Sequence, residues 1–195
     1  MLAKVLSAAN VGLDAVPVTI EVDIASQGLP SFTIVGLADR AVEESKERVR
    51  SAIRNSGADF PARKITVNLA PADLPKEGPQ YDLPIALGLL LASEQIAAQN
   101  SAQIDLSQTL VVGELSLDGS LRRTQGILPL ALLAKQMKLK QMIVPKENGA
   151  EAAIVDQIQV LAFGSLLDLV KVLLGQAEVK PIKKQKLNLE METNF

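Results

Sequence analysis

KITVNLAPADLPKEGPQYDLPIAL, residues Lys64–Leu87, carries the strongest fold signals of this chain. It opens with apolar residues at Ile65, Val67 and Leu69 that alternate with polar ones. Alternation with a period of two predicts a β-strand with one buried face. The stretch therefore begins with a strand that packs one side onto a hydrophobic core.

The second part of the stretch predicts a stiff loop that leads into a buried helix. Prolines and a glycine interrupt residues 71–79, which disfavours a regular strand or helix there. Asp82 is a favourable N-cap, Pro84 fits a first helical turn, and Ile85–Ile96 is almost wholly apolar. We expect the loop to present polar side chains at one place, namely Lys76, Glu77, Gln80, Tyr81 and Asp82.

The composition excludes several kinds of site. The chain has 195 residues and a net charge of −2, and it contains neither cysteine nor histidine. Disulfides, cysteine nucleophiles, Ser-His-Asp triads and zinc centres built on Cys or His are therefore excluded, and we expect no metal or cofactor in this chain. No apolar run reaches the length of a membrane span and no targeting segment is recognisable, so we expect a cytoplasmic protein without a membrane partner.

Patterns along the chain predict an α+β fold. Three strands in quick succession, Leu2–Val11, Val16–Ala25 and Ser31–Val35, favour an antiparallel meander, and a helix capped by Asp39 is expected up to Asn55. Strands and helices alternate after the central stretch, which indicates a mixed, partly parallel sheet with helices packed on it. The later elements, after a polar surface loop at residues 97–107, are expected at Thr109–Leu117, Ser120–Arg123, Ile127–Met137, Gln141–Val144, Ala150–Asp156, Gln159–Ala162 and Ser165–Leu174.

One domain is expected over residues 1–175, followed by a lysine-rich linker over residues 176–195. Beyond Gly175 the hydrophobic periodicity ends and like charges accumulate, which keeps a segment extended. The lysines of this segment include Lys180, Lys183, Lys184 and Lys186.

Four motifs in this order resemble the N-terminal domain of the ComM/YifB family, which are bacterial magnesium-chelatase-like AAA+ proteins. The motifs are VGLADRAVEESKERVRSAI (Val35–Ile53), NLAPADLPKEGPQYDLPIAL (Asn68–Leu87), VGELSLDGSL (Val112–Leu121) and IVPKEN (Ile143–Asn148). The resemblance extends over residues 1–174 and implies the fold of the C-terminal, proteolytic domain of Lon protease.

The resemblance also implies a place in a larger machine. In the family an AAA+ ATPase module follows this domain, and the ComM branch is a DNA helicase that promotes branch migration during natural transformation. ATP and magnesium are expected only in that module, because this chain has no G-x-x-x-x-G-K-[ST] phosphate loop. The implied partners are the AAA+ module, to which the linker leads, neighbouring subunits of a hexamer, and DNA.

Comparison with Lon predicts that the domain itself is not an enzyme. Lon proteases have a serine after the Gly-Pro pair and a lysine in the helix that precedes the Ile-Pro-x-Glu-Asn-like turn. Here Gln80 follows Gly78-Pro79, and the position of the lysine falls on Leu130. An amide and a leucine supply neither nucleophile nor base, and such a pair acts as a unit. A peptidase with relocated catalytic groups is a further alternative, for which the chain offers no serine-lysine pair.

Two groups of basic residues are candidates for direct nucleic-acid binding: one lies on the helix before Asn55 and is extended by Arg63 and Lys64, and the other lies at the end of a hairpin. Glutamates on the same helix balance the first group, and no aromatic residues are interleaved with it for base stacking. This balance favours a solvated surface, while a DNA-binding module stays open as the second hypothesis. The candidates are Lys46, Arg50, Arg54, Arg63, Lys64, Arg122 and Arg123.

The loop residues Lys76, Glu77, Gln80 and Tyr81 admit two interpretations. Their role is structural if the prolines only stiffen the entry to the helix. A rigid loop with charges at its tip also suits contact with a neighbouring subunit or with the AAA+ module. The first hypothesis for the chain is therefore an interaction and scaffolding domain.

Overall fold

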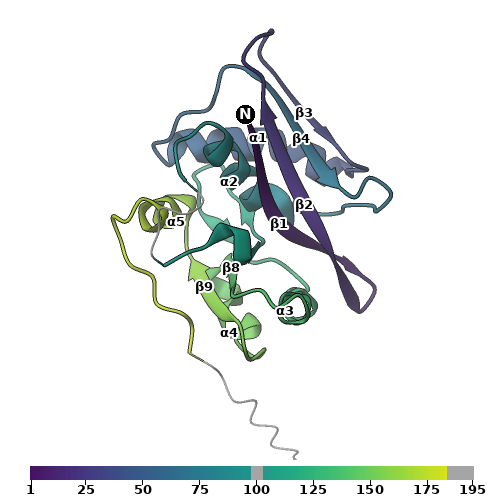
Figure 1. The fold of residues 1–195 in the computed structure, drawn as a ribbon, viewed down its shortest axis with the longest axis vertical. Helices are drawn as coiled ribbons and strands as arrows, with labels where there is room; N and C mark the ends of the chain where they lie inside the picture. Colours follow the sequence, from purple (N-terminus) through teal and green to yellow (C-terminus); the bar gives the residue numbers. More distant parts are fainter. Residues whose placement is uncertain (98–102, 184–195) are drawn as a thin grey trace, which may run out of the picture.

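The computed structural model describes residues 1–97 and 103–183, which form a seven-stranded mixed sheet with helices on both faces (Figure 1). The strand order is β3-β4-β2-β1-β5-β8-β9. β1 pairs antiparallel with β2 and β2 with β4, whereas the other neighbours are parallel. The predicted α+β class is confirmed. The strands are β1 (Leu2–Val11), β2 (Asp14–Ile24), β3 (Ser31–Val35), β4 (Lys64–Ala70), β5 (Thr109–Val111), β8 (Gln141–Pro145) and β9 (Gln159–Phe163).

The first three strands do not form the expected meander. β4 lies between β2 and β3, and β3 pairs in parallel with β4. The cause is helix α1 (Arg40–Asn55), which connects β3 to β4, because a helical crossover joins strands that run in the same direction. Only the hairpin of β1 and β2 follows the expected antiparallel pattern.

The expected strand Thr109–Leu117 is broken in two. β5 stays in the large sheet, while β6 (Glu114–Leu115) pairs with β7 (Leu121–Arg122) in a separate hairpin. Between β5 and β6, the Gly113 N–H donates to the Gln80 carbonyl at 2.9 Å, and a Cβ at Gly113 would lie 3.2 Å from the Leu83 side chain. The chain leaves the sheet at Gly113 because the central loop packs against its backbone.

Two hydrophobic clusters fill the two sides of the sheet. Helices α1, α2 (Asp82–Ala92) and α5 (Leu166–Leu173) cover one face, and α3 (Ile127–Gln136) and α4 (Gly149–Ala152) cover the other. Every residue of α2 is buried, as its apolar sequence predicts. Among the described residues, none of the helices has the length and hydropathy that a bilayer crossing requires. Short 3-10 helices are η1 (Pro79–Tyr81), η2 (Leu106–Gln108) and η3 (Lys146–Asn148).

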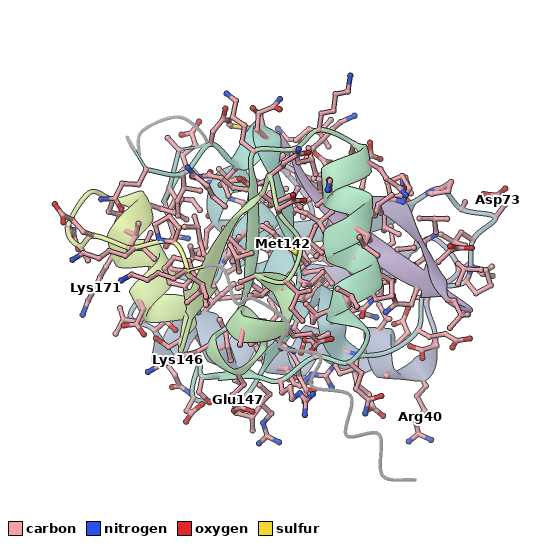
Figure 2. The ribbon with its side chains drawn as sticks, turned by 90° about the horizontal axis from the view of Figure 1, so that it is seen from below. Arg40, Asp73, Met142, Lys146, Glu147 and Lys171 are labelled. Carbon is pink, nitrogen blue, oxygen red and sulfur yellow. The ribbon has the colours of Figure 1, made fainter. Side chains whose placement is uncertain are left out.

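Charged side chains surround this apolar interior. Figure 2 shows Met142 of β8 within the body of the molecule, whereas Arg40, Asp73 and Lys171 lie at its margin. Lys146 and Glu147 of η3 are also exposed. The described surface therefore carries both signs of charge, in agreement with the small net charge of the chain.

The first part of the expected linker packs on the domain. The Val179 N–H donates to the Gln103 side chain, and the Ile182 N–H donates to the carbonyl of Val160 in the edge strand β9, both at 2.9 Å. The domain boundary at residue 175 stays a prediction. Lys184 and Lys186 of the expected linker lie outside the described residues, as do residues 98–102 of the expected surface loop.

Candidate functional site

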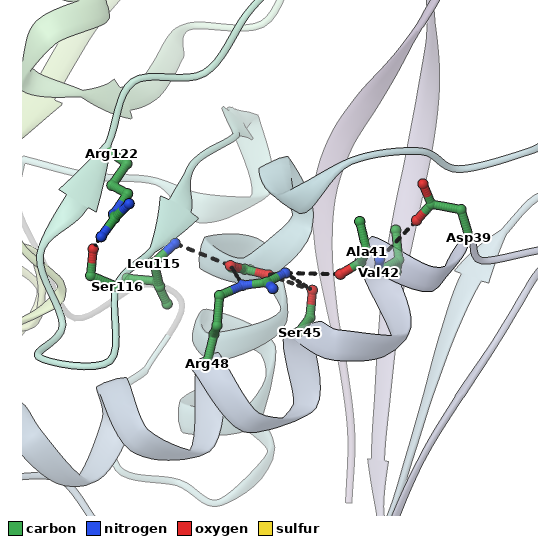
Figure 3. A network of polar contacts seen from close by, with 9 residues as sticks. Asp39, Ala41, Val42, Ser45, Arg48, Leu115, Ser116 and Arg122 are labelled. Atoms are coloured by element: carbon green, nitrogen blue, oxygen red, sulfur yellow. Dashed lines mark hydrogen bonds and ion pairs between the residues drawn. The ribbon is translucent and has the colours of Figure 1, made fainter.

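A buried carboxylate anchors the central loop from the helix side. Arg48 Nε donates to Asp82 Oδ2 at 2.7 Å, and Arg48 Nη2 donates to Asp82 Oδ1 at 3.1 Å. The Leu115 N–H donates to the same carboxylate at 3.1 Å, and so does the Ser45 hydroxyl. Figure 3 shows Arg48, Ser45 and the Leu115 amide converging on this point. Asp82 thus joins α1, α2 and β6.

This network corrects the expected N-cap of α2. Tyr81 occupies the cap position without a side-chain bond, and Asp82 is the first helical residue. Its carboxylate bonds to Arg48 because a buried charge is stabilised by a cation and several donors together. Burial raises the pKa of Asp82, while the bonds from Arg48 and Ser45 act in the opposite direction.

Lys76 is not at the tip of the loop but fully buried, which corrects its expected exposure. Its Nζ donates to the Gly36 carbonyl at 2.9 Å and also to the Pro71 carbonyl. Its backbone N–H donates to the Leu37 carbonyl at 3.1 Å. Burial lowers the pKa of the Lys76 amine. The lysine therefore ties the central loop to the β3–α1 connection and presents no charge to a partner.

Two further residues of the expected contact surface are also inside the fold. Tyr81 is fully buried, and its burial raises the pKa of its hydroxyl to about 12. Gln80 is 8% exposed, and its Nε2 donates to the Ala8 carbonyl at 3.0 Å. Glu77 is exposed. Of the four proposed interface residues, only Glu77 is placed where a partner could reach most of its side chain.

A cavity of about 840 Å³ opens beside Gly78 and Pro79, where a Lon protease would have its serine. Gln80 lines it, but Leu130 does not: Leu130 is fully buried in the cluster between α3 and the sheet. The two positions expected to replace the Lon pair are therefore not brought together around this cavity. The lining residues are Asn10, Gly12, Leu13, Asp39, Glu77, Gly78, Pro79, Gln80, Glu114, Arg123, Thr124, Gln125, Gly126 and Pro129.

This lining offers carboxylates, amides, one threonine and one guanidinium, with no serine or lysine among these described residues. A guanidinium stays protonated in proteins and cannot serve as the base of a nucleophile. Nowhere in residues 1–97 and 103–183 do three His, Cys, Asp or Glu side chains gather in a way that could hold a metal ion. The described lining of the cavity therefore lacks the serine and the lysine of a Lon-type pair.

The wall of the cavity is fixed by Asn148 of the IVPKEN motif. The Thr124 N–H donates to Asn148 Oδ1, and Asn148 Nδ2 donates to the Thr124 carbonyl, both at 2.8 Å. Asn148 is fully buried. This reciprocal pair gives the motif a structural role that sequence reasoning missed, because the two residues are 24 positions apart.

The predicted basic residues fall into separate places. Lys46 is paired with Glu43 at 2.5 Å, and the Lys64 side chain lies next to Gly28. Arg122 donates to the Ser116 hydroxyl at 2.5 Å. Arg123 lines the large cavity and lies 3.9 Å from Glu151. None of these four residues lines the cleft in which Arg50, Arg54 and Arg63 meet.

Arg50, Arg54 and Arg63 do come together, and they meet two phenylalanines. The guanidinium carbons of Arg50 and Arg54 lie 5.3 and 5.9 Å from the centroid of the Phe60 ring. The Phe32 ring lies 5.8 Å from that of Phe60, at 41°. No aromatic residue is interleaved with the basic residues in the sequence, but the fold brings aromatic rings to them from β3 and from the loop after α1.

These residues form the arginine–phenylalanine cleft, an indentation of about 230 Å³. Its lining consists of Pro30, Ser31, Phe32, Arg50, Arg54, Phe60, Pro61, Ala62 and Arg63. A signal for it exists in the sequence, because Gly57 ends α1 and only a short segment separates it from β4. That segment must fold back beside the C-terminal half of α1, which carries Arg50 and Arg54.

Comparisons with known proteins agree with the motifs. The family model for the ChlI subunit of Mg-chelatase matches residues 20–148. Competence protein ComM of Haemophilus influenzae is 46% identical over 178 residues, which are 91% of this chain and 34% of ComM. The uncharacterized protein YifB of Salmonella typhimurium is 51% identical over 156 residues, 80% of this chain and 29% of YifB.

A more distant similarity links the chain to proteases. Lon protease 2 of Bacillus subtilis is 29% identical over 154 residues, 71% of this chain and 26% of that protein. The chain spans about a third of the length of ComM. Because the family model covers most of the chain, and ComM and YifB are 46% and 51% identical over 91% and 80% of it, this chain belongs to the magnesium-chelatase-like ComM/YifB family.

Proposed function

We propose that this chain is a non-catalytic, Lon-like interaction domain of a ComM-type, ATP-dependent DNA branch-migration helicase. The observation that carries the proposal is Gln80, which lines the cavity at the Lon serine position with its amide bonded to the Ala8 carbonyl. A primary amide held in this way does not attack a peptide carbonyl. The domain then acts through contacts with its own ATPase module and with neighbouring subunits.

The work on DNA is assigned to the longer protein. ComM, named as a competence protein, extends well beyond the region that matches this chain. ATP and magnesium bind in the AAA+ module of that longer protein, and this domain helps to organise a hexameric ring. Its mixed surface charge supports protein contacts better than a general attraction to nucleic acid.

Two assays of the 195-residue chain test the absence of catalysis. We expect no release of phosphate from ATP and no cleavage of labelled casein. A Gln80→Ser variant is the matched comparison, and it too should stay inactive because the cavity supplies no lysine. Casein cleavage that copurifies with the chain and is lost in a Glu114→Gln variant would contradict the proposal, since Glu114 lines this cavity.

The scaffolding role is tested with a full-length family member. Sedimentation in the presence of ATP should give a hexamer for the whole protein, and a smaller hexamer fraction when residues 1–175 are deleted. An unchanged hexamer fraction together with unchanged branch migration would argue against an organising role.

A further inference from the structure

The arginine–phenylalanine cleft concentrates cations beside aromatic faces. Arg50 comes from α1 and pairs with Glu47 at 3.1 Å. Arg54 and Arg63 have no carboxylate within ion-pair distance among the described residues. Two of the three guanidinium groups are therefore available to an external anion.

The aromatic side of the cleft is partly open. Phe32 and Phe60 are half-buried, so each packs on the core with one part and faces the cleft with another. Pro30 and Pro61 lie at its borders and limit backbone motion. An indentation of about 230 Å³ lies among these side chains and is open to a ligand from solution.

This combination matches the chemistry of a single-stranded nucleic acid. Unpaired bases stack on aromatic rings and on guanidinium planes, and arginines pair with the phosphates that connect the bases. A duplex keeps its bases stacked internally, so it would use the arginines but not the rings. An acidic peptide would likewise use only the charges.

We propose that the arginine–phenylalanine cleft binds single-stranded nucleic acid, with a base stacked on the platform that Phe60 forms with the Arg50 and Arg54 guanidinium groups over its ring, and with the flanking phosphates paired with the guanidinium groups of Arg50, Arg54 and Arg63. This inference deepens the proposed function. It rests on that function in one respect, namely that the longer protein acts on unpaired DNA. It assigns this domain a direct contact with the strand, in addition to its contacts with protein.

The test is fluorescence anisotropy of a labelled oligothymidylate titrated with the 195-residue chain at two low salt concentrations. Phe60→Leu keeps an apolar side chain but removes the ring, and we expect it to weaken binding about tenfold with the salt dependence unchanged. A triple variant with Arg50→Gln, Arg54→Gln and Arg63→Gln should bind less tightly. Its plot of log affinity against log salt concentration should be less steep, with the magnitude of the negative slope reduced by about 2.

A matched triple variant controls for net charge. Lys135→Gln, Lys140→Gln and Lys171→Gln remove the same charge from α3, the turn before β8, and α5, so they should leave binding nearly unchanged. Circular dichroism melting checks that every variant is folded. Arg63→Gln alone, in an exposed loop, replaces the triple arginine variant if that variant unfolds.

Three results would overturn the inference. The first is the absence of salt-sensitive binding by the wild-type chain. The second is equal binding by Phe60→Leu, or equal competition by oligoglutamate, either of which would reduce the cleft to a charged surface. The third is an equal loss in the lysine control. None of these three results would change the outcome of the tests for catalysis or for hexamer formation. The proposed function and this inference can therefore be disproved independently of each other.

Discussion

Arg48 Nε lies 2.7 Å from Asp82 Oδ2, and this ion pair joins α1 to α2 through two residues that are 34 positions apart in the sequence. Asp82 is fully buried, while the Arg48 side chain is 21% exposed, so the pair closes the interior at the start of α2. The Leu115 amide completes the contact from the hairpin of β6 and β7. The loop that carries Gly78 and Pro79 ends on this pair.

Removing one partner should be costly. Asp82→Ala leaves the Arg48 guanidinium next to an empty buried site, and loss of one member of a buried pair costs about 3–5 kcal/mol. We expect that decrease in the free energy of unfolding, measured by urea denaturation with circular dichroism because the chain has no tryptophan. A double variant, Arg48→Met with Asp82→Leu, should lose less than the two single variants combined. A loss below about 1 kcal/mol for Asp82→Ala would show that the pair contributes little.

The buried amine of Lys76 should also stabilise the fold. Lys76→Met keeps most of the apolar stem but removes the donor for the Gly36 and Pro71 carbonyls. A buried acceptor left without a donor costs about 1–3 kcal/mol, so we expect a loss in that range or above it. Glu77→Ala, at the exposed neighbouring position, should change stability by less than about 0.5 kcal/mol. Similar effects of the two substitutions would place Lys76 at the surface.

Tyr81 gives a prediction for high pH, because it is the single tyrosine of the chain. Its burial raises the pKa from 10.0 to about 12, so its absorbance near 295 nm should titrate late in the folded protein. The unfolded chain loses this proton first, so the folded state loses stability as pH rises from about 10 to about 12. Tyr81→Phe should flatten that part of the stability profile. A titration centred near 10 in the folded chain would contradict the burial.

Local sequence patterns were sufficient to predict those features of the fold that depend on interactions between neighbouring residues. The alternation in Lys64–Ala70 and the cap at Asp39 depend on neighbours in the sequence, and both were predicted correctly: the Asp39 side chain accepts from the Val42 N–H at 2.8 Å. The order of β3 and β4 required knowledge of the crossover through α1. The sequence does contain the helix between the two strands, but the strand order follows from how this helix connects them and not from the periodicity of either strand.

The candidate site was harder to predict because its contacts are distant in the sequence. Lys76 looks like a surface residue until Gly36, 40 positions away, supplies its acceptor. Asp82 looks like a helix cap until Arg48 is placed beside it. The basic stripe on α1 was found from its spacing, but Phe32 and Phe60 join it only after β3 and the loop after α1 are positioned. The sequence therefore identified many of the polar side chains, but it did not predict which residues from distant parts of the chain contact them.

The segment after α5 gives the last prediction, because it covers the otherwise unpaired edge of β9. The Ile182 N–H donates to the Val160 carbonyl, and the Ile182 side chain lies close to Gly149, where an added Cβ would be 3.1 Å from it. An edge strand exposes unpaired backbone groups, and a segment docked on it is protected from exchange. We expect the Ile182 amide to exchange at least about tenfold more slowly than an unstructured amide, measured by hydrogen exchange.

Substitutions at the dock should release this protection. Gly149→Leu fills the place of the Ile182 side chain, and Ile182→Asp removes the apolar contact, so both should bring the exchange of residue 182 close to the unstructured rate. Leu167→Asp is the matched control, since Leu167 is 38% exposed and Ile182 is 36% exposed. It lies on α5 and should leave the Ile182 amide protected. Slow exchange would show that residues 176–183 pack on the domain in solution, whereas fast exchange of the Ile182 amide in the wild type would show that this segment does not stay docked on β9.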